Sequence, residues 1–218
     1  MNSKISTIIF DLDGVIVDSE PMHFEAAKET MNEFGIKLTL EEYMEFGVAK
    51  GARNLFEKLS EKYKIDIDIN RAFEIKKNKF QEIFEKNAFP RKGILELLES
   101  FEGKYTLAIA SSGTRESVMF VLDKLNIANK FSLIVVAEDV SRVKPFPDIY
   151  NKTVQMLGVD KDYCVAIEDS ATGVTAAKEA GIRCLAVPCE FTKNQNFSDA
   201  YVVLENIEQI ADFVEKLT

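Results

Sequence analysis

The sequence predicts an α/β fold: a doubly wound parallel sheet with an all-helical unit inserted after its first strand. From about residue 90 onward, apolar runs without polar alternation are separated by amphipathic segments of helical period. Strands covered by helices on both faces of a parallel sheet have this pattern. After the apolar run Ile8–Phe10, the chain from about Pro21 to Ala88 is helical in period with almost no strand signal. We therefore expect a core of residues 1–17 and 90–218 and a helical unit of residues 18–89.

The elements expected from these patterns follow in chain order. A buried strand at Ser6–Phe10 comes first, and the insertion then holds four helices, at His23–Phe34, Leu40–Phe46, Ala52–Tyr63 and Ile69–Lys86. After Pro90 and Gly93, the expected helices are Ile94–Phe101, Glu116–Leu125, Pro147–Leu157, Ala171–Ala180 and Ile207–Leu217. The strands between them are Tyr105–Ala110, Leu133–Ala137, Cys164–Ile167, Arg183–Val187 and the weaker Tyr201–Leu204.

Composition limits the classes of function. The 218 residues are 46% hydrophobic, which is enough for one core and a smaller unit. The net charge of −9 argues against a nucleic-acid partner. No apolar run reaches the length of a membrane span, so we expect no membrane partner. The three cysteines lack metal-ligand spacing, which predicts reduced thiols in a cytoplasmic protein.

Asp11 and Asp13 follow the first strand directly. Because strand side chains alternate in direction, the two carboxylates are expected on the same side. One could act as a nucleophile and the other as a proton carrier, with a metal ion holding the first. Surface turns are rich in Asp and Gly, so this pair needs support from other strand ends.

The next expected strand ends at Ser111-Ser112-Gly113, a hydroxyl and glycine turn that opens a helix. In a parallel sheet, ligands bind outside the carboxyl ends of the strands. Helix N-terminal amides at such a turn favour an anion. An ordinary Ser or Thr helix cap is the plainer alternative for this turn.

Lys144 and the pair Glu168-Asp169 complete the strand ends. Lys144 precedes a stiff Pro-x-Pro segment that fixes its backbone, although a solvated lysine is the plainer alternative. Adjacent acids before a helix of small residues suit Mg²⁺, while capping of the next helix is an alternative for Asp169. Four carboxylates at one sheet edge cannot all remain ionised without cations. Mg²⁺ and Lys144 would supply that charge, and the surplus would receive a phosphate.

This pattern resembles the haloacid dehalogenase superfamily of phosphotransferases. The matching residues are Asp11-Leu12-Asp13-Gly14-Val15 with Asp18, Ser111, Lys144-Pro145, and Glu168-Asp169 with Gly173. The resemblance implies a Rossmann-like core with a helical cap domain, and the branch it indicates is β-phosphoglucomutase-like.

The resemblance also implies a role for each motif residue. Asp11 is expected to take the phosphoryl group, and Asp13 to move the proton. Ser111, with Ser112 and Gly113 beside it, is expected to hold the phosphoryl oxygens, while Lys144 neutralises charge. The implied metal ligands for Mg²⁺ are Asp11, the carbonyl of Asp13, Glu168 and Asp169.

Three residues of the insertion are candidates for substrate binding. His23 is the only histidine, and Lys50 and Arg53 lie in a glycine-containing segment that opens a helix. The plainer alternatives are a polar residue at a helix start and solvated charges in an interhelical turn.

We expect a monomeric Mg²⁺-dependent phosphatase of small phosphorylated metabolites, sugar or polyol phosphates, acting through an aspartyl phosphate. The alternative is a β-phosphoglucomutase-type sugar phosphomutase. Thr114 stands where the mutases resembled tend to have a lysine, which favours the phosphatase.

Overall fold

The computed structural model describes residues 4–87 and 89–217. These fall into two compact units. One combines the chain up to Asp18 with the chain from Phe89 onward, and the other comprises the segment from Ser19 to residue 87.

The first unit is built on a six-stranded parallel sheet in the order β3-β2-β1-β4-β5-β6. The strands are β1 (Thr7–Phe10), β2 (Thr106–Ala110), β3 (Leu133–Val135), β4 (Cys164–Glu168), β5 (Arg183–Ala186) and β6 (Val202–Val203). β1 is central, with Ile9 in register with Ala108 on one side and Ala166 on the other. Every residue of β1 is buried, as expected for a strand covered on both faces. The predicted α/β class is confirmed.

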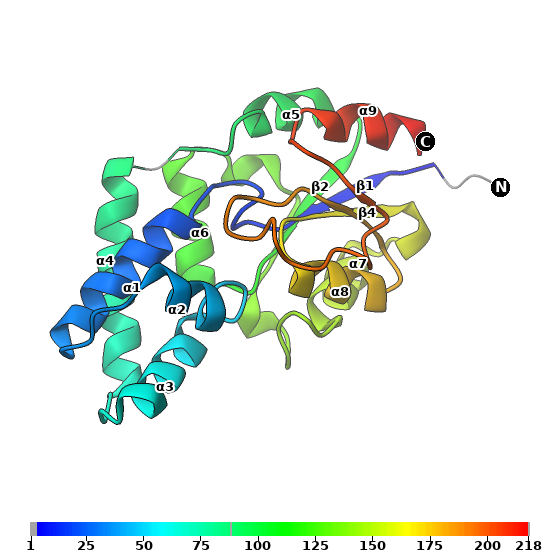
Figure 1. Cartoon of the computed structure of the whole chain (residues 1–218). Coiled ribbons are helices and arrows are strands. Elements are labelled where there is room, and N and C mark those ends of the chain that lie inside the picture. The colour runs from blue at the N-terminus through cyan, green and yellow to red at the C-terminus, as the bar shows by residue number, and fades with distance from the viewer. Residues whose placement is uncertain (1–3, 88, 218) are drawn as a thin grey trace. The chain divides into compact units, whose positions relative to one another are not determined.

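Helices cover both faces of this sheet (Figure 1). They are α5 (Ile94–Phe101), α6 (Arg115–Lys124), α7 (Asp148–Leu157), α8 (Ala171–Glu179) and α9 (Gln209–Lys216). α5 and α9 pack together on one face, and α7 and α8 pack together on the other. The side chains between the sheet and the second pair form one buried apolar cluster that includes Ile9, Val135, Ile149 and Val174.

Several predicted bounds were wrong. The third strand ends at Val135, and Ala137–Asp139 forms a 3₁₀ turn because the Asp139 carboxylate accepts a hydrogen bond from the Val136 N–H at 2.9 Å. The last strand is only Val202–Val203, and the final helix begins at Gln209.

The second unit contains four helices within its described residues, α1 (Glu20–Glu33), α2 (Leu40–Phe46), α3 (Ala52–Tyr63) and α4 (Ile69–Asn87). α1 starts three residues earlier than predicted, because Pro21 is tolerated in a first helical turn. α4 packs against both α1 and α3. Across the described part of the chain, no helix is both long and apolar enough to cross a membrane.

Candidate active site

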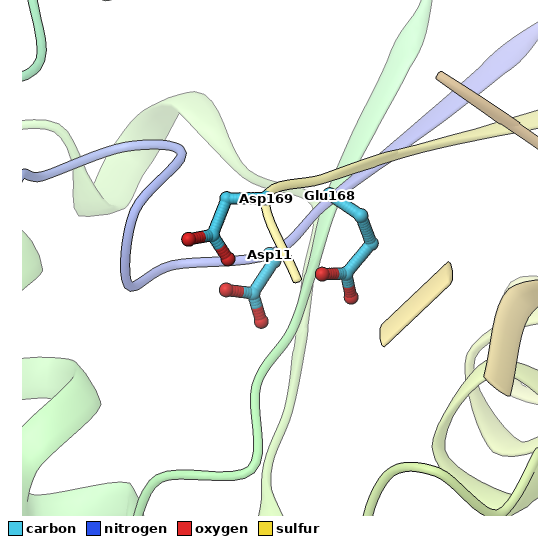
Figure 2. A group of neighbouring side chains, drawn as sticks. All are labelled: Asp11, Glu168 and Asp169. Carbon is cyan, nitrogen blue, oxygen red and sulfur yellow. The ribbon is translucent and has the colours of Figure 1, made fainter. Parts of the chain in front are cut away.

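Three carboxylates meet at the carboxyl ends of β1 and β4. Asp11 directly follows β1, Glu168 is the last residue of β4, and Asp169 comes next. All three are buried, and one oxygen from each lies within 4.8 Å of the others. Figure 2 shows the three side chains converging from the two neighbouring strands. The parallel pairing of β1 and β4 therefore places carboxylates from distant parts of the chain together.

Lys144 supplies positive charge to this group. Its ammonium donates to Asp11 Oδ1, to Glu168 Oε1 at 2.6 Å and to the Ala110 carbonyl at 2.8 Å. Burial alone would lower the pKa of Lys144, but the charges of Asp11 and Glu168 outweigh it and raise that pKa. Lys144 is therefore a buried, charged lysine shared between two carboxylates.

One lysine does not balance the carboxylates. Burial raises the pKa of Asp11 to about 8; Lys144 opposes the rise, and the charges of Glu168 and Asp13 add to it. A divalent cation among these oxygens would favour their charged forms and lower that pKa.

Two glycines allow the carboxylates to occupy their positions. A Cβ atom on Gly173 would lie 2.0 Å from the Glu168 carboxyl carbon, and one on Gly14 would lie 2.1 Å from Asp169 Oδ2. Gly14 also has a φ of +78°, which side chains rarely adopt. Both positions therefore require glycine for close approach.

Two of the carboxylates also receive hydrogen bonds that the sequence did not reveal. The Tyr150 hydroxyl donates to Glu168 Oε1 at 2.6 Å. The Thr192 hydroxyl donates to Asp169 Oδ2 at 3.2 Å, and the Cys189 thiol lies 3.4 Å from the same oxygen. Nothing in the spacing of these residues indicates such contacts, which depend on the packing of α7 and of the loop after β5.

Arg91 is a second residue that the sequence did not single out. Its guanidinium donates to the carbonyls of Gly14, Val187 at 2.7 Å and Pro188 at 2.9 Å. It thereby joins the turn after β1 to the loop after β5. The proximity of Arg91 to Pro90 in sequence gave no hint of this role.

The Ser111 turn follows β2 at the same edge of the sheet. The Ser111 side chain is buried, and its oxygen accepts a hydrogen bond from the Gly113 N–H at 3.0 Å. Thr114 caps α6 by accepting from the Ser117 N–H at 3.3 Å. The Arg115 N–H, at the start of α6, donates to the Glu138 carboxylate at 3.0 Å. Ser112 is exposed in the same turn.

Asp13 lies in the turn after β1 and is half-buried. This turn is closed by the Gly14 N–H, which donates to the Val17 carbonyl at 2.7 Å. The charge of Asp13 contributes to the raised pKa of Asp11, so the two acids are near each other.

The three candidates in the helical unit make contacts within that unit. The His23 ring stacks on Phe80 at 4.0 Å between centroids, and its Nδ1 lies 2.6 Å from the Lys76 ammonium. Lys50 donates to the Glu45 carbonyl at 2.6 Å. Arg53 donates to Asn70 at 2.9 Å and lies 4.8 Å from the centroid of the Phe73 ring.

The carboxylate group fits a Mg²⁺ ion. Hard cations of this kind take oxygen ligands, and Asp11, Glu168 and Asp169 offer them within one small volume. Burial raises the pKa of Asp11, and the charges of Glu168 and Asp13 add to that rise, so a cation among these oxygens would favour the ionised carboxylate. The absence of a Cβ atom at Gly14 and Gly173 leaves room for the carboxylates of Asp169 and Glu168 in these positions.

The chain is similar in sequence to a known protein family and to several known proteins. A family model for haloacid dehalogenase-like hydrolases matches residues 8–187. The chain is 34% identical over 182 residues to the phosphorylated carbohydrates phosphatase of Thermotoga maritima, with 82% of each chain covered. It is 35% identical over 192 residues to the protein SUPPRESSOR OF QUENCHING 1, chloroplastic, of Arabidopsis thaliana. That match covers 84% of this chain but only 18% of the longer plant protein.

Solved structures show the same fold. CbbY of Rhodobacter sphaeroides, crystallised in complex with phosphate, superposes with a TM-score of 0.86 at 27% identity and covers 94% of this chain and 96% of its own. A candidate β-phosphoglucomutase of Thermotoga maritima superposes with a TM-score of 0.80 at 26% identity, covering 98% of this chain and 100% of its own.

Proposed function

The chain belongs to the haloacid dehalogenase-like hydrolases, in their β-phosphoglucomutase-like branch, and from this membership and its site we propose that it is a Mg²⁺-dependent phosphatase of small phosphorylated metabolites. The substrates proposed are sugar or polyol phosphates. The single observation that carries the proposal is the contact of buried Asp11 with Lys144 beside Glu168 and Asp169. The Thermotoga relative named for phosphorylated carbohydrates and the phosphate in the CbbY structure support this substrate class.

In the proposed reaction, a carboxylate oxygen of Asp11 attacks the phosphorus of the ester. The bond from phosphorus to the alcohol oxygen breaks, and Asp13 gives that oxygen its proton. The products of this half-reaction are the free alcohol and an aspartyl phosphate on Asp11. Asp13 suits the proton transfer because it lies near Asp11 but is only half-buried.

In the second half-reaction, Asp13 takes a proton from a water molecule, which attacks the phosphorus. The bond to Asp11 breaks, and inorganic phosphate leaves with both acids restored. Lys144 offsets negative charge that develops on the phosphoryl oxygens, and the Ser111 hydroxyl with the Ser112 amide orients them, while the Gly113 amide holds the Ser111 side chain.

The proposed Mg²⁺ ligands are the carboxylates of Asp11, Glu168 and Asp169 and the main-chain carbonyl of Asp13. When bound, the ion would reduce repulsion between Asp11 and the phosphate and polarise the phosphoryl oxygens. The residues of the chain supply the nucleophile, the proton transfers and the oxyanion contacts.

A panel of sugar and polyol phosphates, assayed for released phosphate with and without Mg²⁺, tests the proposal. Asp11→Asn should lower turnover by at least about a thousandfold, because an amide is a poor nucleophile. Asp123→Asn, at an exposed position on α6, is the matched control and should keep wild-type turnover. Folded wild-type protein that releases no phosphate from any substrate in the panel would contradict the proposal.

The phosphomutase alternative is favoured by the similarity to the candidate β-phosphoglucomutase. It predicts that β-glucose 1-phosphate becomes glucose 6-phosphate, with traces of a bisphosphate. Hydrolysis of the substrate to glucose and phosphate, without the isomer, would exclude this alternative.

We propose that His23, Lys50 and Arg53 contribute to substrate preference from the helical unit. Alanine at each position should change the ratio of kcat/KM between substrates of the panel. Unchanged ratios in all three variants would assign these residues to the internal contacts that they make with Phe80, Glu45 and Asn70.

Net charge and free cysteines favour a cytoplasmic enzyme without nucleic-acid partners, and we expect it to be monomeric.

A further inference from the structure

Tyr150 is a fully buried tyrosine on α7 whose hydroxyl contacts one of the proposed metal ligands. The hydroxyl donates to Glu168 Oε1 at 2.6 Å, and the Glu168 side chain is fully buried. Tyr150 has no part in the proposed attack, proton transfer or oxyanion contacts. A buried hydroxyl that binds a charged carboxylate at this distance is nevertheless a strong, charge-assisted hydrogen bond.

The contact acts on one of the two Glu168 oxygens. Oε1 accepts hydrogen bonds from both Tyr150 and Lys144, each at 2.6 Å. Oε2 has a longer contact of 3.5 Å with the Ser170 hydroxyl. Two strong donors on Oε1 fix the rotation of the carboxylate and leave the lone pairs of Oε2 for another ligand.

The direction of the hydrogen bond between Tyr150 and Glu168 follows from the two groups, because the hydroxyl carries a proton and a carboxylate oxygen accepts one. A protonated hydroxyl beside an ionised carboxylate can only donate, so the direction of the hydrogen bond is determined.

We propose that Tyr150 is a positioning residue that holds Glu168 in the orientation in which it binds Mg²⁺. The inference rests on the proposed function, because it concerns the metal that the proposed reaction uses. Ligating carboxylates are commonly oriented by hydrogen bonds of this kind, and loss of such a partner typically costs 10- to 100-fold in metal affinity.

The hydroxyl can be separated from the rest of the side chain. The Tyr150 ring packs in the apolar cluster beneath the sheet, and the Lys144 ammonium lies 5.4 Å from the ring centroid. Phenylalanine keeps the ring, its packing and its contact with the lysine. Tyr150→Phe therefore removes the hydrogen bond to Glu168 alone.

The test is a calorimetric titration of the purified protein with Mg²⁺, in the absence of substrate. Tyr150→Phe should weaken Mg²⁺ binding at least about tenfold and should need correspondingly more Mg²⁺ for half-maximal turnover. Tyr163→Phe is the matched control, since it removes a hydroxyl from an exposed tyrosine of the same unit and should bind Mg²⁺ as the wild type does.

Thermal unfolding separates a positioning role from a purely structural one. The rise in Tm produced by a fixed Mg²⁺ concentration should be smaller in Tyr150→Phe than in the wild type. A lower Tm in the metal-free protein combined with wild-type Mg²⁺ affinity would overturn the inference. In a Glu168→Gln background, Tyr150→Phe should weaken Mg²⁺ binding much less than in the wild type, because the oriented carboxylate is already gone.

Failure of the inference and failure of the proposed function give different results. If the wild type binds Mg²⁺ and Tyr150→Phe binds it with the same affinity, only the role of Tyr150 is overturned. Wild-type protein that binds no Mg²⁺ overturns the proposed metal dependence and this inference with it.

Discussion

The two units each bury a carboxylate, but in opposite electrostatic settings. Glu42 in the helical unit accepts hydrogen bonds from the Thr39 N–H at 2.9 Å, the Thr39 hydroxyl at 3.0 Å and the Tyr63 hydroxyl at 2.6 Å, and it pairs with Lys62 at 2.9 Å. Burial alone would raise its pKa, but these partners lower it to about 2. In the sheet unit, by contrast, the pKa of Asp11 rises to about 8.

The difference shows how an acid with a structural role can be told from an acid that is a candidate for function. Glu42 has more donors than its charge requires, and its contacts cap α2 and join it to α3. Asp11 shares one lysine with Glu168 and lies close to Asp169. Both side chains are nearly inaccessible to solvent, but burial raises the pKa of Asp11 more than Lys144 lowers it, whereas the partners of Glu42 outweigh the effect of its burial. A buried acid whose partners do not offset its burial suits a site for a cation and an anionic substrate.

Among the changes that test this comparison, the largest effect is expected from removing Lys144, which pairs with both Asp11 and Glu168. Lys144→Met should lower turnover by about 10²- to 10³-fold, because charge on the phosphoryl oxygens is no longer offset. Steady-state kinetics at saturating Mg²⁺ would measure this loss. Lys178→Met removes a half-exposed lysine that pairs with Asp199 and should leave turnover unchanged. A Lys144→Met variant with turnover within tenfold of the wild type would place Lys144 with structural pairs such as Lys62–Glu42.

A methyl group beside Glu168 should have the next largest effect. Gly173→Ala places a Cβ atom 2.0 Å from the Glu168 carboxyl carbon, so the carboxylate must move away. We expect Mg²⁺ binding to weaken about 10- to 100-fold, measured by calorimetry. Glu179→Ala, at an exposed position on the same helix, is the control. Unchanged affinity in Gly173→Ala would mean that Glu168 is not needed for the metal.

The smallest expected effect is on stability in the helical unit. Glu42→Gln should lower the free energy of unfolding at pH 7 by roughly 2 kcal/mol, allowing for the half-exposed Lys62. Because folding lowers the pKa of Glu42 from 4.5 to about 2, this stabilisation is complete above pH 4.5 and is lost as pH falls towards 2.

Urea unfolding of both proteins at several pH values would measure this difference. The wild type and Glu42→Gln should differ by a constant amount above about pH 5 and converge in acid. A difference that does not depend on pH would show that the Glu42 charge adds nothing to stability, and turnover at neutral pH should be unchanged in either case.

Much of the fold could be predicted because it depends on local pattern. The ranges of α2, α3 and α5 agree with the periodicity, since apolar positions repeat every three or four residues between clear end signals. The 3₁₀ turn at Ala137–Asp139 could not be predicted from an apolar run, because it depends on the hydrogen bond between Asp139 and the Val136 N–H. β6 is an edge strand whose length is set by its pairing with β5 over two residues, and hydrophobicity does not reveal where such a pairing ends.

The candidate site also contains residues that the sequence could predict and residues that it could not. The rule that ligands lie beyond the carboxyl ends of parallel strands pointed to Asp11, Lys144, Glu168 and Asp169, which the structure places together. Tyr150 could not be identified, because a tyrosine in a buried helix looks like any other core residue until its hydroxyl has a partner. The contacts of Arg91 are with main-chain carbonyls. Every residue has such a carbonyl, so the residue types that accept these hydrogen bonds do not reveal them.

The central position of β1 has a consequence for the order of events during synthesis. β1 is the first strand made, yet its neighbours in the sheet are Thr106–Ala110 and Cys164–Glu168, and Lys144 lies 133 residues after Asp11. Closing such long loops is slow, and the pairings cannot form before those segments leave the ribosome. A nascent chain therefore contains Asp11 early but cannot assemble the acidic group around it until β4 is complete. The proposed Mg²⁺ affinity should consequently appear in one of the last steps of folding. Its appearance would show that the central strands of the sheet have paired.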